Sequence, residues 1–325
     1  MIKQPGGNFV FILITLIISL NISGQEYSSG PDYQMTLLSN PGLTGAEGDG
    51  YIRLSYMNHY PGNNYDLHSV HLSYDGYFPA LHGGAGFFLS NDYMGGIVNN
   101  LRSGFSYAYF FQAGKNLFIA AGLSASLYHR GYNFGGAVLP DQIDPLGGST
   151  IPSGEILSER GRNVLDLGTG FLFMTEKLLW GISVCHLTEP DIGSAEASES
   201  KLNRRLLLHF AGDFNISKEK NLKIRPLAVF DLREGFISTG AGAVLESKYL
   251  SVSSLFLTDN KKNFDLQPGF SVSVSSLVLF YNYRFNIASG NNLLPFSLLH
   301  RTGIALSLNN FDKRKSVKTI NFPKL

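Results

Sequence analysis

The sequence predicts an antiparallel, up-and-down β-barrel of about fourteen strands that spans a membrane, and three observations favour this all-β fold. Apolar and polar residues alternate in short runs from residue 51 onward. Beyond residue 24, no apolar stretch approaches the ~18 residues that a membrane-spanning helix needs. Short turns alternate with longer loops. Because only helices and closed barrels satisfy their backbone polar groups in lipid, such a chain crosses a membrane as a barrel.

The composition also separates the chain from typical soluble domains. Hydrophobic residues make up 44% of the chain and charged residues 16%, against roughly 25% charged residues in a soluble domain. Glycine (36 residues) and aromatic residues (13%) are abundant. Lys3 is the only charged residue before Gln25, so the rest of the chain carries equal numbers of acidic and basic residues. This balance does not favour binding to nucleic acid.

The chain divides into four parts. Residues 1–24 have the pattern of a cleavable signal peptide: a basic start, an apolar run too short to span a bilayer, and small residues at the end. No cysteine follows, as a lipoprotein would require, and the single Cys185 is expected to be a buried thiol. We then expect a periplasmic N-terminal segment over 25–50, the outer-membrane barrel over 51–311 and a basic C-terminal tail over 312–325.

The alternation assigns residues to the two faces of each strand. Phe105, Tyr107 and Tyr109 share one face of a run, whereas Ser106 and Ala108 share the other. An apolar face toward lipid and a polar or small-residue face toward the lumen is the pattern of a membrane barrel. By the strand rules about fourteen runs are expected, near 51–58, 67–75, 83–91, 102–113, 117–132, 163–175, 180–186, 204–216, 222–231, 236–245, 249–257, 264–274, 277–285 and 300–308.

The connections between these runs alternate in length. The even-numbered connections are all short, at 76–82, 114–116, 176–179, 217–221, 246–248 and 275–276. Most odd-numbered ones are longer, at 92–101, 133–162, 187–203 and 286–299, although 232–235 and 258–263 are short. Outer-membrane barrels have short periplasmic turns and longer external loops. A soluble β-sandwich, the main alternative, does not explain this asymmetry.

Two groups of side chains have expected positions in this barrel. Strand alternation directs Arg205, Asp213, Asp166 and Arg284 toward the lumen, where pairing between charges would partly fill the interior. Aromatic residues near strand ends are consistent with interfacial girdles, or for several of them with packing inside the barrel. These are Tyr51, Tyr56, Tyr74, Phe110, Tyr128, Tyr132, Tyr249 and Tyr281.

No constellation of residues predicts a catalytic, cofactor-binding or metal site. Asp141, Asp144 and Glu155 share one long loop and could offer oxygen ligands to Ca²⁺. Their spacing matches no EF-hand, and an ordinary solvated loop is favoured. The stretch 240–244, which contains two glycines, lacks the third glycine and the helix of a dinucleotide-binding loop.

The histidines likewise form no motif. No His-Glu-x-x-His or Cys-His cluster is present. His68 and His71 are three residues apart, which places them on opposite faces of a strand. Structural or rim positions are therefore favoured for all eight histidines: His59, His68, His71, His82, His129, His186, His209 and His300.

Six blocks of sequence occur in the order and spacing of one known family. They are Asn40-Pro41-Gly42-Leu43-Thr44-Gly45 with Arg53, then Ser106–Tyr109, Gly122 with 141–145, 166–187, 201–204, and His300 with Gly303. Through them the chain resembles the PorP/SprF family of outer-membrane proteins of type IX secretion in Bacteroidetes, over nearly its whole mature length. Ser55-Tyr56 departs from the family's Gln-Trp, and the tail after Phe311 is a further departure.

The resemblance implies an outer-membrane component of the type IX secretion system without enzymatic activity. Such proteins support the secretion or surface attachment of partners such as adhesins, which relates them to gliding motility. The implied partners are outer-membrane lipid, an exported surface protein with a C-terminal secretion signal, and a periplasmic peptidoglycan-linked secretion component. The alternative is a passive channel or transporter for small solutes, because barrels of more than a dozen strands can enclose an aqueous lumen.

Overall fold

Most of the described chain forms one antiparallel sheet. The computed structural model describes residues 36–308 except 49, 64, 135–141, 145–147, 150–160, 194–199, 218–220 and 291–294. The sheet contains β1 (Tyr51–His59), β2 (Leu67–Phe78), β3 (Gly83–Met94), β4 (Val98–Gln112), β5 (Phe118–Tyr132), β8 (Arg162–Met174), β9 (Leu178–Cys185), β10 (Arg205–Gly212), β11 (Phe214–Ser217), β12 (Leu222–Arg233), β13 (Phe236–Glu246), β14 (Leu250–Asp259), β15 (Phe264–Val274), β16 (Leu277–Ala288) and β17 (Ser297–Ser307).

Five short elements complete the described structure. Two of them, α2 (Thr36–Ser39) and the 3-10 helix η1 (Pro41–Leu43), precede the first strand, and η2 (Pro79–Leu81) forms the turn between β2 and β3. A small separate ladder joins β6 (Ile143–Asp144) to β7 (Gly148–Ser149). Among the described residues, no helix is long and apolar enough to cross a membrane.

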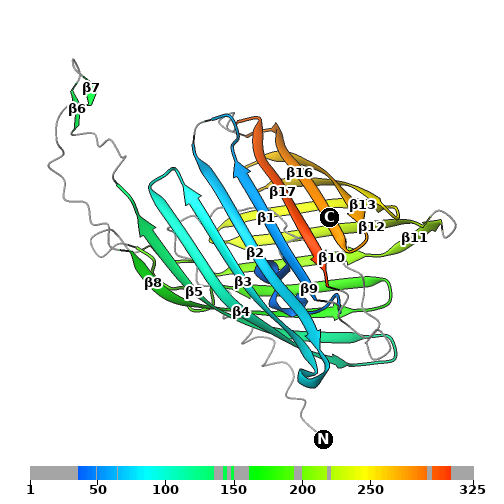
Figure 1. The fold of residues 1–325 in the computed structure, drawn as a ribbon. Coiled ribbons are helices and arrows are strands. Elements are labelled where there is room, and N and C mark those ends of the chain that lie inside the picture. The colour runs from blue at the N-terminus through cyan, green and yellow to red at the C-terminus, as the bar shows by residue number, and fades with distance from the viewer. Residues whose placement is uncertain are drawn as a thin grey trace, which may run out of the picture.

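The sheet closes on itself as a barrel (Figure 1). The first strand pairs with the last, from Tyr51 opposite Ser307 to His59 opposite Leu299. At another position around the wall, β10 pairs with both β9 and β12. Since β10 and β11 are two segments of one strand interrupted at Asp213, the barrel has fourteen strands. The predicted fold class is confirmed, and each predicted run corresponds to one barrel strand.

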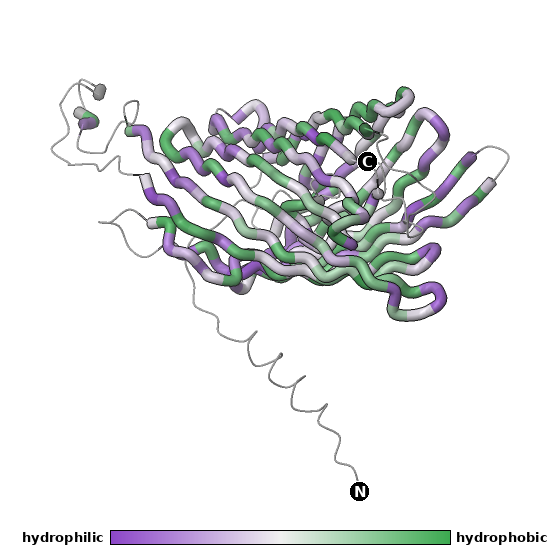
Figure 2. The backbone as a smooth tube through the Cα atoms, turned by 60° about the horizontal axis from the view of Figure 1, so that its bottom comes forward, coloured by the Kyte–Doolittle hydropathy of each residue, from purple (hydrophilic) through white to green (hydrophobic). Residues whose placement is uncertain are grey.

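The outer and inner faces of the wall have reversed polarity relative to a soluble protein. On β4, Phe105 is 71% exposed, whereas its neighbour Ser106 is only 4% exposed. Figure 2 shows hydrophobic and hydrophilic residues alternating along the wall. The exposed set is apolar on strand after strand, and the buried set includes many serine, histidine, arginine and aspartate side chains. The outer face is therefore solvated by lipid, and the polar side chains line the lumen.

Rows of paired residues across the outer face show the depth of the apolar belt. One row runs through β16, β17, β1, β2 and β3 and is wholly aliphatic: Leu279, Ile304, Leu54, Leu72 and Leu89. Two rows nearer the long loops, the corresponding residues are aromatic or polar: Tyr283, His300, Asn58, His68 and Tyr93. A row of this composition suits the headgroup layer, so Leu54 lies in the hydrocarbon and Asn58 at its outer boundary.

The structure corrects one predicted loop. Residues 92–101 were expected to form a long connection, but β3 continues to Met94 and β4 begins at Val98. The connection is a three-residue turn in which Gly95 and Gly96 have φ angles of 63° and 71°. Glycine adopts this left-handed conformation without steric cost. Polar residues that extend a strand above the membrane look like a loop in the sequence because the alternation fades there.

We expect a charge on the outer face to be tolerated according to depth. Replacing Leu54 with arginine should lower the free energy of unfolding by ~2–4 kcal/mol, because the site lies in the aliphatic row, whereas Asn58→Arg on the same strand should cost about 0–1 kcal/mol. Urea unfolding of the barrel in lipid vesicles measures both. Equal losses for the two variants would contradict this placement of the membrane.

Candidate functional site

The N-terminal segment before β1 lies inside the barrel. Leu37, Leu43 and Ala46 are buried, and η1 packs against β4, β5, β8 and β9. Figure 1 shows α2 and η1 enclosed by the wall strands. The prediction of a periplasmic segment over 25–50 is therefore wrong for residues 37–46. We refer to residues 37–46 as the lumenal segment.

Asn40 fixes this segment to one side of the wall. Its side-chain Nδ2 donates to the backbone oxygens of Phe171 (3.3 Å) and Ile182 (3.4 Å) and lies 3.0 Å from Nε2 of His209. Its Oδ1 accepts from the backbone N–H of Gly42 at 2.8 Å, so it also caps η1. A fully buried amide with all these partners holds its position strongly, because removing it would leave buried polar groups unpaired.

The segment is also bound farther along the same part of the wall. Thr44 Oγ1 lies 2.6 Å from Oγ of Ser106. The backbone N–H of Gly45 donates to Oδ2 of Asp75 at 2.8 Å, and Asp75 in turn accepts from Arg53 at 2.5 Å. The segment thus makes polar contacts with β2, β4, β8, β9 and β10, and it lies along the consecutive strands of the wall from β2 to β10.

Glycines in the wall make room for this contact. A Cβ atom on Gly122 of β5 would lie 2.3 Å from the backbone carbon of Pro41, and one on Gly84 of β3 would lie 2.0 Å from the oxygen of Thr44. These distances are impossible for a real side chain, and backbone atoms cannot move aside as a flexible side chain does. Only glycine at these two positions lets the segment lie directly on the sheet.

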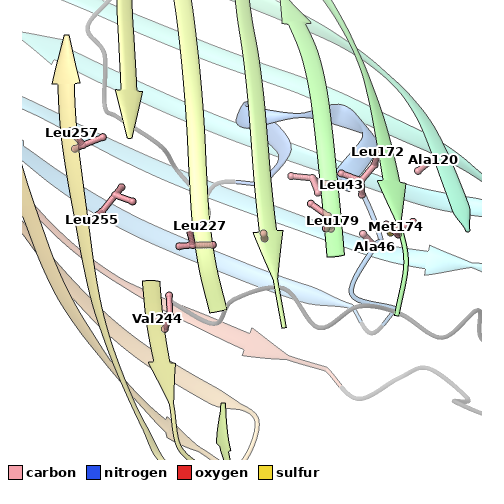
Figure 3. Close-up of a cluster of buried hydrophobic side chains, with 11 residues drawn as sticks. Leu43, Ala46, Ala120, Leu172, Met174, Leu179, Leu227, Val244, Leu255 and Leu257 are labelled. Atoms are coloured by element: carbon pink, nitrogen blue, oxygen red, sulfur yellow. The ribbon is translucent and has the colours of Figure 1, made fainter. Parts of the chain in front are cut away.

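Apolar side chains line the wall beside the segment. A buried cluster surrounds Leu43 and Ala46 and includes Ala120, Leu172, Met174, Leu179, Ala211, Leu227, Val244, Leu255 and Leu257. Figure 3 shows Leu43, Leu172 and Leu179 beside the helical turn of the segment and the other side chains on strands farther along the wall. Met174 and Leu179 lie next to a short turn, whereas Leu257 lies toward the external end of β14. An apolar layer therefore lines part of the wall beside the segment.

Charged side chains form internal pairs toward both ends of the lumen. Each of the four charged residues predicted to face inward forms an ion pair: Arg205 with Asp231 (2.8 Å), Asp166 with Arg102 (2.9 Å), Arg284 with Asp265 (2.5 Å) and Asp213 with Lys223 (3.3 Å). The inward direction and the pairing are confirmed. Three of the four pairs join strands that are consecutive in the predicted order, whereas Asp166 of β8 reaches past β5 to Arg102 of β4. Pairing offsets the cost of burying these charges.

The external loop between β9 and β10 covers the lumen at its external end. Ile192 and Leu202 are buried and pack with Tyr128 of β5. The loop also completes the wall, because β9 is short and pairs with β8 only from Thr169 to Met174. Beyond that point, the backbone N–H of Leu187 donates to Leu167 O at 2.9 Å.

Asp191 organises this loop. Its Oδ1 accepts from the backbone N–H groups of Gly193 (3.0 Å) and Ser200 (3.2 Å), and its Oδ2 accepts from Arg162 of β8 at 2.6 Å. The N–H of Gly193 is the main reason that the pKa of Asp191 lies below its ordinary value, and Ser200 and Arg162 add to the effect. The ionised carboxylate thus ties the loop to the wall.

The eight aromatic residues near strand ends divide between the two expected positions, the interfacial girdle and the barrel interior. By strand alternation Tyr56, Tyr74 and Tyr281 face outward, and Tyr249 lies exposed in a turn. The other four face the lumen, and they are Tyr51, Phe110, Tyr128 and Tyr132. There Phe110 packs on the apolar cluster and Tyr128 packs on the external loop. Cys185 is buried as expected, with Sγ 3.8 Å from Leu38 O of the lumenal segment.

The histidines lie apart from one another in distinct surroundings. His71 is buried in the lumen and His68 stacks on Tyr93 outside, as their spacing predicted. His186 lies 2.9 Å from Asp166, and His209 contacts Asn40. In the described part of the chain, no three His, Cys, Asp or Glu side chains are placed to hold a metal ion.

The remaining predictions concern the glycine-containing stretch, the loop carboxylates and the two ends of the chain. The glycine-containing stretch at 240–244 is part of β13. The loop carboxylates considered as Ca²⁺ ligands, for which an ordinary solvated loop was favoured, cannot be placed. Asp141 and Glu155 lie outside the described residues, as does the side chain of Asp144. The signal peptide at 1–24 and the tail at 312–325 also lie outside them.

The lumenal segment was missed in the sequence. Its signal was present, because residues 36–45 carry no charge and include the Asn40-Pro41 start of a short helix, which suits burial better than a solvated position. Nothing local, however, shows which strands contain the matching glycines.

The closed wall, its lipid-facing surface and its filled lumen define an integral outer-membrane β-barrel. The profile of the family described as "Type IX secretion system membrane protein PorP/SprF" matches residues 32–295. The chain belongs to this family and is a membrane component of the type IX secretion system. The match includes the lumenal segment and all the barrel strands except β17.

Other comparisons add no functional information. No curated protein matches the chain. Among solved structures, Omp33 of Acinetobacter baumannii has a TM-score of 0.46 at 10% identity, covering 81% of this chain and 100% of that one. A deletion mutant of the TodX monoaromatic hydrocarbon channel has a TM-score of 0.49 at 10% identity, covering 88% and 95%. The KdgM porin has a TM-score of 0.37 at 8% identity, covering 79% and 98%.

Displacement of the lumenal segment should be visible at Cys185, a natural reporter beneath it. In Gly122→Val the new side chain would overlap the backbone of Pro41, so the segment must leave its site. We expect labelling of Cys185 by a water-soluble maleimide to become at least about tenfold faster, because the protected state loses its cover. Gly131→Val on the same strand is the control, since its nearest contact would be an ordinary 3.4 Å. Unchanged labelling in Gly122→Val would contradict the proposed packing.

The loop that covers the lumen should loosen at low pH. Because the pKa of Asp191 in the folded protein is depressed, its stabilising effect is present above its ordinary pKa and is lost as the pH falls through the depressed value. The loss should be below about 1 kcal/mol, since the site is largely exposed. Hydrogen exchange of residues 186–204 against pH measures it. Asp191→Asn should show this loosening at every pH, and an unaltered pH dependence in that variant would exclude the mechanism.

Proposed function

We propose that the protein is a protein-binding component of the type IX secretion system that holds an exported partner at the cell surface and conducts no solute through its lumen. The observation that carries this proposal is the occupied lumen. The lumenal segment lies inside the barrel against the wall from β2 to β10, with Asn40 bound to β8, β9 and β10 and Gly45 bound to Asp75 of β2. A passive channel needs a continuous water path, which this arrangement opposes.

The side chains around the segment support the same conclusion. Porin-like conduction requires charged groups that remain solvated along the pore. Here Asp166 is fully buried between Arg102 and His186, and Arg53 is buried against Asp75. These charges bind one another and the N-terminal segment. They support a barrel whose interior serves stability and specificity.

Protein binding is then assigned to the external loops. The two longest connections, at 133–161 and 186–204, are both on the external rim. Together they contain eight acidic residues and three basic ones, so they carry a net negative charge. In the family that the sequence resembles, the partner is an exported surface protein such as an adhesin with a C-terminal secretion signal. A binding role of this kind requires no catalytic group, and we include the absence of enzymatic activity in the proposal.

Deletion of the gene followed by a proteomic survey of the cell surface and the medium tests this function. We expect one or a few surface proteins with C-terminal secretion signals to leave the surface and appear in the medium or accumulate inside. Re-expression of the wild-type protein should restore them. Loss of all such cargo would indicate a core machine part, and loss of none would contradict the proposal.

Conductance separates the proposal from its rival. Purified wild-type barrel in planar bilayers should show no open-channel current, whereas Gly122→Val, which displaces the lumenal segment, should conduct. A stable wild-type current together with an unaltered set of surface proteins in the deletion strain would favour a passive channel.

A further inference from the structure

The hairpin formed by β11 and β12 extends past its neighbour at the rim of short turns. β9 begins at Leu178, which pairs with Gly212, and the turn before it occupies 175–177. β11 starts beyond this point, at Phe214, and within the described chain it pairs with β12 alone. Figure 1 shows the end of this hairpin projecting outward from the barrel near the label β11. On its other side the hairpin is covered, because Lys223 pairs with Glu246 of β13.

The free side of β11 presents backbone hydrogen-bonding groups. The N–H of Asp213 donates to Lys177 O at 2.8 Å, toward the side where β9 lies. Backbone groups of alternate residues point the same way in a strand, so the N–H and C=O of Asn215 point to that side too. There the described chain offers no partner strand. Such an edge is a template for one more strand.

The side chains beside this edge favour a strand of alternating polarity. Ile216 is 54% exposed and shares the outward face with Phe214, whereas Asn215 is exposed on the opposite face. An added strand would extend both faces, with apolar residues beside Phe214 and Ile216 at the membrane boundary and polar residues beside Asn215. Main-chain bonds then supply affinity, and alternate side chains supply specificity.

Charge indicates the kind of strand that this edge attracts. The described short turns at 113–117, 175–177 and 247–249 contain three lysines and one glutamate, a net charge of +2. The chain's own tail, at 312–325, contains five basic residues and one acidic residue. The rim therefore repels this tail and attracts an acidic segment, and complementary charge speeds the encounter as well.

We propose that β11 is a docking edge to which a periplasmic partner protein adds an extended segment with alternating apolar residues and acidic flanks. The inference rests on the proposed function only in taking the occupant to be a protein of the secretion system. It concerns the rim of short turns, whereas the surface partner is assigned to the external loops. The two can therefore fail separately.

A pair of substitutions at one position isolates the backbone contribution. Asn215→Pro removes the N–H that the added strand would use, at an edge position where proline is compatible with the sheet. Asn215→Ala changes the side chain and keeps the N–H. The probe is a short synthetic peptide that alternates valine and threonine between terminal glutamates, added to the full mature barrel in detergent. Fluorescence anisotropy gives the affinity, hydrogen exchange reports protection of the Asn215 amide, and the heat-dependent gel shift confirms folding of each variant.

The wild type and Asn215→Ala should bind this peptide alike, with protection of the amide at position 215 in the wild type, and Asn215→Pro should bind roughly tenfold more weakly or worse. A lysine-flanked version of the peptide should bind more weakly than the glutamate-flanked one. Equal binding by folded Asn215→Pro, equal binding of the two peptides, or no binding by the wild type would each overturn the proposal. So would protection of Asn215 in the unliganded full chain that disappears on removal of residues 312–325, because the edge would then hold the chain's own tail. None of these results would alter the surface-protein survey, which tests the proposed function alone.

Discussion

Hydrocarbon cannot hydrogen-bond to a peptide group, and this constraint determines the rest of the structure. Every backbone N–H and C=O in the membrane must find a partner within the protein. The ladder between β1 and β17 meets this requirement, because it pairs every residue from Tyr51 to His59 and leaves the sheet without an edge in the lipid. Strand alternation then sends apolar side chains outward, as at Phe105, and polar ones such as Ser106 inward. The polarity of both faces follows from closure.

Closure at this circumference creates an interior that wall side chains alone do not fill. The chain supplies the remaining volume from its own N-terminal segment, which enters as a short apolar helix with polar anchors. Leu43 and Ala46 join the apolar cluster, while Asn40 and Thr44 bond to the wall. The inward ion pairs are weak evidence for stability, since desolvation opposes their attraction. They join strands that lie side by side in the wall, such as β10 with β12 and β15 with β16, and so favour one register of the sheet.

The strands could be predicted because alternation is a local property, readable within each run. The lumenal segment could not, because its contacts join residues far apart in the chain: Asn40 meets His209, and Pro41 lies against Gly122. The partners of the inward charges depend on register, which no single run encodes, as with Arg205 and Asp231. The face that each aromatic residue occupies could be predicted in part, because Tyr51 has the same strand parity as the inward Arg53. Nearness to a strand end does not determine which face a residue occupies, and the face decides whether it is buried.

The wall is not equally strong around its circumference. β8 and β9 share six paired positions, whereas β5 and β8 share thirteen, and outside that short ladder the loop held by Asp191 takes the place of a strand. Fewer main-chain bonds at one seam mean that less work is needed to part the wall there than elsewhere. The loop held by Asp191 therefore contributes more to separating the interior from the outer leaflet at this seam than a loop does where neighbouring strands pair along their whole length.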